Sequence, residues 1–123
     1  IGKVTIDRVG LSCKVYEGAT DSSMSKGAGH YTSSSLYYGN VGLFGHTRGS
    51  HPYFGQLKNV KLGDIVTYKT SLGTKTYKVT FVGAISYTDY SCLNEMGDNR
   101  ITLITCIANQ PSLRLCVQAV EIR

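Results

Sequence analysis

Residues 63–87, "GDIVTYKTSLGTKTYKVTFVGAISY", carry the pattern that most restricts the fold of this chain. Apolar and polar residues alternate from Ile65 to Thr70 and again from Thr76 to Ser86. A period of two is typical of a β-strand that buries one of its faces. The Ser-Leu-Gly sequence between the runs is suited to a tight turn, so the segment predicts a β-hairpin.

The rest of the sequence predicts more strands and little helix. Fourteen Gly, nine Tyr and two Pro among 123 residues, with many β-branched residues, favour a strand-built domain. Further strands are expected at Val4–Ile6, Cys13–Tyr16, "VGLFGH" ending at His46, "RITLITC" and "LRLCVQAV". One short helix is expected in residues 19–40, with helical turns near Phe54–Leu57 and within residues 87–99. We therefore expect one all-β domain over residues 1–123, a mostly antiparallel barrel of about eight short strands with one or two short helices.

Composition argues against several classes of protein. The net charge of +5 comes from 13 basic and 8 acidic residues that are scattered along the chain, which favours a solvated surface over a nucleic-acid footprint. No run of 18 apolar residues occurs, so any membrane anchor is expected to lie outside this chain. The four cysteines show no Cys-x-x-Cys spacing, which argues against a zinc or thioredoxin-like site. Four thiols are favoured, and two disulfides remain possible.

The last two predicted strands bring reactive side chains together. Alternation places Thr102, Ile104 and Cys106 on one face of the first strand, and it points Arg114, Cys116 and Gln118 of the second strand away from the core. If these strands pair, Cys106 lies nearly opposite Arg114. A guanidinium beside a cysteine favours the thiolate, and it can donate hydrogen bonds to an oxyanion.

A thiolate nucleophile also needs a proton donor for its leaving group, and histidine suits this role near neutral pH. His46 directly follows an apolar strand, whereas His30 and His51 lie in Gly- and Ser-rich segments, so His46 ranks first. By residue type and spacing alone, a structural role remains the commoner outcome for each member of the set Cys106, His46 and Arg114.

Several motifs together resemble those of the sortases, cysteine transpeptidases of Gram-positive cell surfaces. They are "TLITC" at 102–106, "RLCV" at 114–117, "GH" at 45–46, Phe54 with Leu57, "GD" at 63–64, "GAGHY" at 27–31 and "GN" at 39–40. The resemblance implies an eight-stranded barrel in which Cys106 attacks the Thr–Gly bond of a Leu-Pro-x-Thr-Gly sorting signal. It further implies that His46 protonates the departing amine, and that Arg114 positions the substrate and stabilises the oxyanion. An amine of a cell-wall precursor would then resolve the thioester.

The resemblance also suggests substrate-binding residues. Thr105 is expected to assist the oxyanion, and Thr102 and Ile104 to line the floor of the groove. Cys92 and Leu93 lie in the loop that covers the Leu-Pro end of the signal in sortases, with simple loop packing as the alternative. Among sortase classes the compact form and "GAGHY" look most like class D, with classes A and E behind it.

The expected partners are surface proteins with a C-terminal sorting signal and an amine nucleophile, at the extracellular face of a Gram-positive cell membrane. No cofactor, metal or nucleic acid is expected. Calcium takes six to eight oxygen ligands. The loop after His46 offers only Asp64, while Asp89, Glu95 and Asp98 lie in another loop, so no calcium requirement is expected.

Two other functions remain open at this point. A cysteine hydrolase would use the same Cys106, His46 and Arg114 and release its acyl-enzyme to water. A small basic β-barrel could instead bind nucleic acid through its tyrosines and positive charge.

Overall fold

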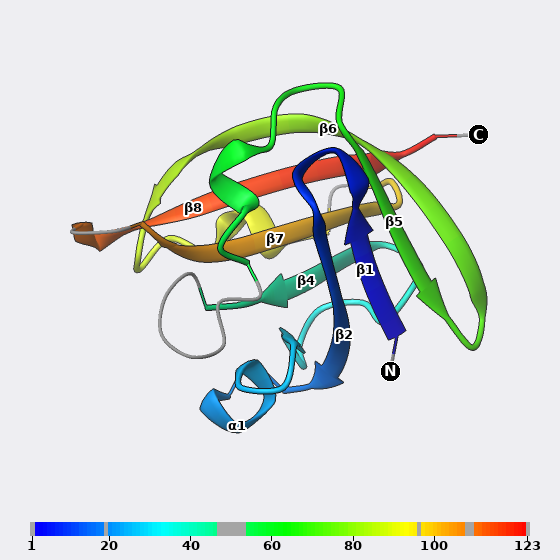
Figure 1. Ribbon diagram of the computed structural model, residues 1–123, viewed down its shortest axis with the longest axis horizontal. Helices are drawn as coiled ribbons and strands as arrows, with labels where there is room; N and C mark the ends of the chain where they lie inside the picture. The colour runs from blue at the N-terminus through cyan, green and yellow to red at the C-terminus, as the bar shows by residue number, and fades with distance from the viewer. Residues whose placement is uncertain (1, 19, 47–53, 96, 108–109, 123) are drawn as a thin grey trace.

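In the computed structural model the chain forms a closed barrel of eight strands (Figure 1). The structure describes residues 2–18, 20–46, 54–95, 97–107 and 110–122, with the backbone alone at residues 21, 106–107 and 110–111. The strands are β1 (Gly2–Ile6), β2 (Leu11–Glu17), β3 (Ala28–His30), β4 (Asn40–Phe44), β5 (Ile65–Thr70), β6 (Gly73–Ser86), β7 (Arg100–Ile107) and β8 (Gln110–Glu121). Their order around the barrel is β1-β2-β3-β4-β7-β8-β6-β5, and β5 pairs with β1 to close it. The expected all-β barrel is confirmed.

Two features of the sheet differ from the expectation. The pairs β2 with β3 and β4 with β7 are parallel, and β6 and β8 are long strands of 14 and 12 residues. The predicted hairpin is confirmed, but β6 begins at Gly73 rather than at Thr76, because Thr70 already pairs with Gly73. Gly73 and Thr74 are exposed, so the alternation in the sequence does not mark the first residues of the strand.

The helices of the described chain are single turns. The expected helix in residues 19–40 is α1 (Asp21–Met24), and the turn in residues 87–99 is the 3-10 helix η3 (Ser91–Leu93). The turn expected at 54–57 lies slightly later, as η2 (Leu57–Asn59), and η1 (Asp7–Val9) was not expected. Among the described residues, no helix has the length and apolar character needed to cross a membrane.

The barrel has an inner core and a second, outer one. The largest fully buried side chains of the interior include Tyr68, Tyr77, Phe54, Ile6, Leu43 and Leu57. On the outside, Leu93 of η3 packs on Ile104 of β7 and Cys116 of β8, and both of these are fully buried. The sequence analysis placed Cys116 on a face away from the core. That face is instead covered, because the loop that carries η3 folds back over β7 and β8.

Candidate functional site

The candidate catalytic residues lie on two neighbouring strands of the barrel, β7 and β8, and just beyond the end of a third, β4 (Figure 1). Cys106 of β7 is the cross-strand partner of Arg114 of β8, as the hairpin argument predicted. On the other side of β7, Phe44 pairs in parallel with Ile104. Carrying this register two residues further brings His46 level with Cys106. Since neighbouring strands lie about 4.8 Å apart, three distant parts of the sequence meet at one barrel end.

A hollow of about 250 Å³ opens at this end of the barrel. Its lining includes Phe44, His46, Tyr90, Ile104, Thr105 and Arg114. His46 and Arg114 therefore reach one hollow from opposite sides of β7, the strand that holds Cys106. The structure describes the backbone of Cys106 and not its side chain.

Hydrogen bonds fix the segment that carries His46. The Thr105 hydroxyl donates to the Gly45 carbonyl at 2.6 Å, and the Gly45 N–H donates to the Ile104 carbonyl at 3.2 Å. The His46 carbonyl accepts from the Phe54 N–H at 2.9 Å. Thr105 is only 3% exposed, and its hydroxyl proton is engaged in holding the end of β4. Its expected help to the oxyanion stays a prediction.

Gly45 also allows the close packing that positions His46. A Cβ atom at residue 45 would lie 2.6 Å from Cγ of the fully buried Phe54 ring.

We expect Gly45→Ala to lower the free energy of unfolding by about 1–3 kcal/mol, because the core must shift to admit the methyl group. Urea unfolding would measure this. Ser12→Ala, on an exposed position of β2, should stay within about 0.5 kcal/mol of the parent. Equal stability of the parent and Gly45→Ala would contradict the packing argument.

Contacts with Leu113 and Tyr87 help to hold Arg114. Its Nη1 donates to the Leu113 carbonyl at 2.9 Å, and its guanidinium carbon lies 5.8 Å from the centre of the Tyr87 ring. Arg114 pairs with Ile85, and the Tyr87 N–H continues the ladder by donating to Ser112. Tyr87 is thus a diagonal cross-strand neighbour of Arg114, within reach for an aromatic side chain. The sequence analysis missed Tyr87, although it continues the alternation of β6 two residues beyond Ile85.

The contact predicts that Tyr87 helps to orient Arg114. Tyr87→Leu should lower kcat/KM about two- to fivefold, the range for a cation–π contact near the surface. Tyr87→Phe keeps the ring face and should retain most of the activity. Steady-state kinetics on a sorting peptide would compare the two. If Tyr87→Phe lowers kcat/KM as much as Tyr87→Leu does, the contact between the aromatic ring and Arg114 does not support activity.

His30 is not equivalent to His46. His30 is fully buried, with Nδ1 2.5 Å from the Glu17 carboxylate and Nε2 2.8 Å from the Ser35 carbonyl. Both ring nitrogens have oxygen partners within the fold, which makes His30 a structural residue. His51 lies outside the described residues, as do Thr47 and Arg48.

The predicted groove residues lie under the loop of residues 87–99. Thr102 and Ile104 are fully buried, and Leu93 above them is only 8% exposed. The Cys92 carbonyl accepts from Asn40 Nδ2 at 2.8 Å and from Gln118 Nε2 at 2.7 Å. Thr102 lies beneath this loop, whereas Ile104 also lines the hollow beside His46 and Arg114, and the binding roles of both stay predictions. The sequence analysis did not identify Asn40 and Gln118 as the side chains that hold the loop down.

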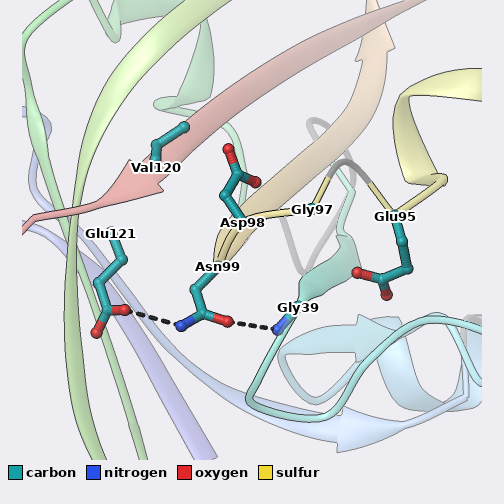
Figure 2. Close-up of a pocket in the computed structure, with 7 residues that line it drawn as sticks. All are labelled: Gly39, Glu95, Gly97, Asp98, Asn99, Val120 and Glu121. Atoms are coloured by element: carbon teal, nitrogen blue, oxygen red, sulfur yellow. Dashed lines mark hydrogen bonds between the residues drawn. The ribbon is translucent and has the colours of Figure 1, made fainter.

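A larger hollow of about 510 Å³ lies at the start of β7, roughly 20 Å along the strand from Cys106 (Figure 2). It contains the carboxylates of Glu95, Asp98 and Glu121. Each already has protein partners. Glu95 accepts from Ser35 and from the Asn40 N–H, Asp98 pairs with Arg100, and Glu121 binds Lys75 and Asn99. The hydrogen bonds from Glu121 through Asn99 to Gly39 cross the hollow in Figure 2.

The other two carboxylates weighed as calcium ligands, those of Asp64 and Asp89, also have protein partners. Asp64 makes a two-point contact with Arg8, and Asp89 accepts from Ser91. Within the described residues no group of three or more His, Cys, Asp or Glu side chains has metal-binding geometry.

We expect turnover to be the same with millimolar calcium as with a chelator. A clear calcium-dependent rise in rate would contradict this prediction.

Comparison with known proteins shows which family this chain belongs to. The model of the Sortase domain family matches residues 4–122, so the chain belongs to the sortase family, a family of enzymes. It is similar to sortase A of Listeria monocytogenes (33% identity over 86% of this chain and 49% of the relative) and of Staphylococcus aureus (32%, 85% and 54%). The chain thus spans about half the length of these curated relatives.

Solved structures share the fold. Sortase C2 of Group B Streptococcus pilus island 1 superposes with a TM-score of 0.93 at 30% identity, covering 100% of this chain and 74% of that one. Sortase A of Listeria monocytogenes superposes with a TM-score of 0.90 at 28% identity, covering 100% and 87%. The expected class D assignment is not supported, because these matching structures are sortases C and A. The nucleic-acid alternative finds no support in the family assignment.

Proposed function

We propose that this chain is the catalytic domain of a transpeptidase that cleaves a Leu-Pro-x-Thr-Gly type sorting signal between Thr and Gly. Cys106 attacks the Thr carbonyl, the C–N bond breaks, and His46 supplies the proton that leaves with the Gly amine. An amine then attacks the thioester and releases Cys106. Covalent catalysis divides one difficult transfer into two easier steps.

The register of three strands supports this proposal most strongly. Cys106 pairs with Arg114, and His46 and Arg114 line the same hollow. In this arrangement a guanidinium favours the thiolate and can donate to the oxyanion of the tetrahedral intermediate, while an imidazole serves as general acid. Cys13, by contrast, is buried inside the barrel, and burial raises the pKa of its thiol to about 11.

The proposed partners follow from the reaction. The acyl donor is a surface protein with a C-terminal sorting signal, and the acceptor is an amine of a cell-wall precursor. This chemistry belongs at the extracellular face of the membrane of a Gram-positive bacterium. No cofactor or metal takes part in the proposed steps.

Incubating a labelled sorting peptide with the protein, with and without an added amine, tests the proposal. We expect an amide product that appears only with the amine, and cleavage between Thr and Gly. Free acid as the only product under both conditions would identify a hydrolase with the same three residues instead. No cleavage of any peptide in a panel that varies the x position would contradict both.

A further inference from the structure

Cys92 and Cys116 form a second thiol site beside the proposed active site. Cys92 lies in η3, and Cys116 lies in β8, opposite Ile104 of β7. Both belong to the outer cluster around Leu93 and Ile104, and both are free thiols in this structure. They are 24 positions apart in sequence, so a bond between them would tie the loop of residues 87–99 to the barrel.

Backbone anchors hold Cys92 above this part of the barrel. Its carbonyl accepts from Gln118 Nε2 at 2.7 Å, and Gln118 lies two residues beyond Cys116 on the same face of β8. On the β7 side, the Thr102 hydroxyl is 3.3 Å from the same carbonyl. The side chains of residues 92 and 116 lie in the same cluster, and several hydrogen bonds fix the loop that carries Cys92.

We propose that Cys92 and Cys116 are an intramolecular disulfide site that a small-molecule disulfide oxidises, and that this bond fastens the loop of residues 87–99 over β7 and β8. The two protein thiols are oxidised, and one small disulfide is reduced to two thiols. This inference stands apart from the transpeptidase proposal, because neither thiol is one of the three proposed catalytic groups.

The electrostatics of the pair give the two thiols different roles. A hydrogen bond from the Cys116 thiol lowers the pKa of Cys92, although partial burial opposes it. The pKa of Cys116 is raised, first by the hydrogen bond to Cys92, then by burial and by the nearby charges of Cys92 and Asp89. The half-buried Cys92 thiolate is thus the group that attacks the oxidant.

The second step follows from the first. Attack of Cys92 on the small disulfide forms a mixed disulfide and releases one thiolate. The charge on Cys92 that opposes ionisation of Cys116 is then gone. Cys116 loses its proton, its sulfur attacks Sγ of Cys92, and the S–S bond of the mixed disulfide breaks to release the second thiolate.

Peptide mapping of a Cys106→Ala variant tests the site without interference from the proposed nucleophile. After incubation with oxidised glutathione and alkylation of the remaining thiols, we expect a linked pair of peptides that contain Cys92 and Cys116, with Cys13 reduced. A further Cys116→Ser change should trap glutathione on Cys92. Alkylated Cys92 and Cys116 in the Cys106→Ala protein, or glutathione left on Cys92, would overturn the proposal, whether or not the Cys116→Ser variant folds.

Hydrogen exchange in the same Cys106→Ala protein tests the fastening of the loop. The Leu93 N–H donates to Tyr90 and the Asn94 N–H donates to Ser91, so both report on opening of the loop. We expect their exchange to slow by at least about tenfold on oxidation, because a cross-link removes open conformations. Unchanged exchange in protein whose disulfide is verified by mapping would refute the fastening role. Neither measurement depends on transpeptidase activity.

Discussion

Replacing Cys106 by alanine is expected to remove peptide cleavage and transfer completely, a loss of at least about 10⁴-fold. The reason is chemical, because alanine has no group that can form the thioester. The fold should survive, since the barrel closes through strand pairs in which residue 106 takes part through its backbone. Product formation on a sorting peptide and the circular dichroism spectrum would measure the two effects.

Cys13→Ala is the matched control for Cys106→Ala. Cys13 is buried inside the barrel on β2, where it pairs with Val4 of β1. Its loss should cost some stability and leave cleavage and transfer intact. Retained activity in Cys106→Ala would contradict the assigned nucleophile, and lost activity in a folded Cys13→Ala would show that the assay does not isolate Cys106.

Replacing Arg114 by glutamine is expected to lower kcat/KM by about 10²–10³-fold, the usual loss when a donor to an oxyanion is removed. Glutamine keeps a polar side chain but removes the charge that favours the Cys106 thiolate. Arg114→Lys restores the charge but lacks the planar guanidinium with its several donors, so it should recover only part of the rate. Steady-state kinetics on the peptide that the parent cleaves best would rank the three proteins.

Lys3→Gln is the charge-matched control for Arg114→Gln. Lys3 is exposed on β1, and the change also removes one positive charge. Its kcat/KM should match that of the parent. If Arg114→Gln keeps more than about half of the parent activity, the guanidinium neither supports the thiolate nor stabilises the transition state.

Local sequence patterns predicted seven of the eight barrel strands and the pairing of the last two, but they missed β3, three buried residues within a Gly- and Ser-rich segment. The spacing of Cys106 and Arg114 around a short polar loop predicted that the two residues lie opposite each other, and the strand register confirms this. The residues that surround His46 were harder to predict. They depend on the parallel pairing of β4 with β7, two strands separated by more than 50 residues. Period-two alternation identifies strands but does not say which distant strands become neighbours.

The outer core shows the main limit of the sequence analysis. Alternation correctly separated Arg114, Cys116 and Gln118 from the inward face of β8, but it could not reveal that a loop covers the outer face. Gln118 is nearly buried and holds the Cys92 carbonyl, a contact between residues 26 positions apart. Polar side chains at such positions look solvent-exposed in a sequence until the covering loop is known.

Trapping the acyl-enzyme tests the central claim most directly. The parent protein would be mixed with a sorting peptide in the absence of added amine, quenched in acid, digested and read by mass spectrometry. We expect the acyl fragment that ends in Thr as a thioester on Cys106, and absent from peptides that carry Cys13, Cys92 or Cys116. Cleaved peptide with no adduct on Cys106, or an adduct on a different cysteine, would contradict the account.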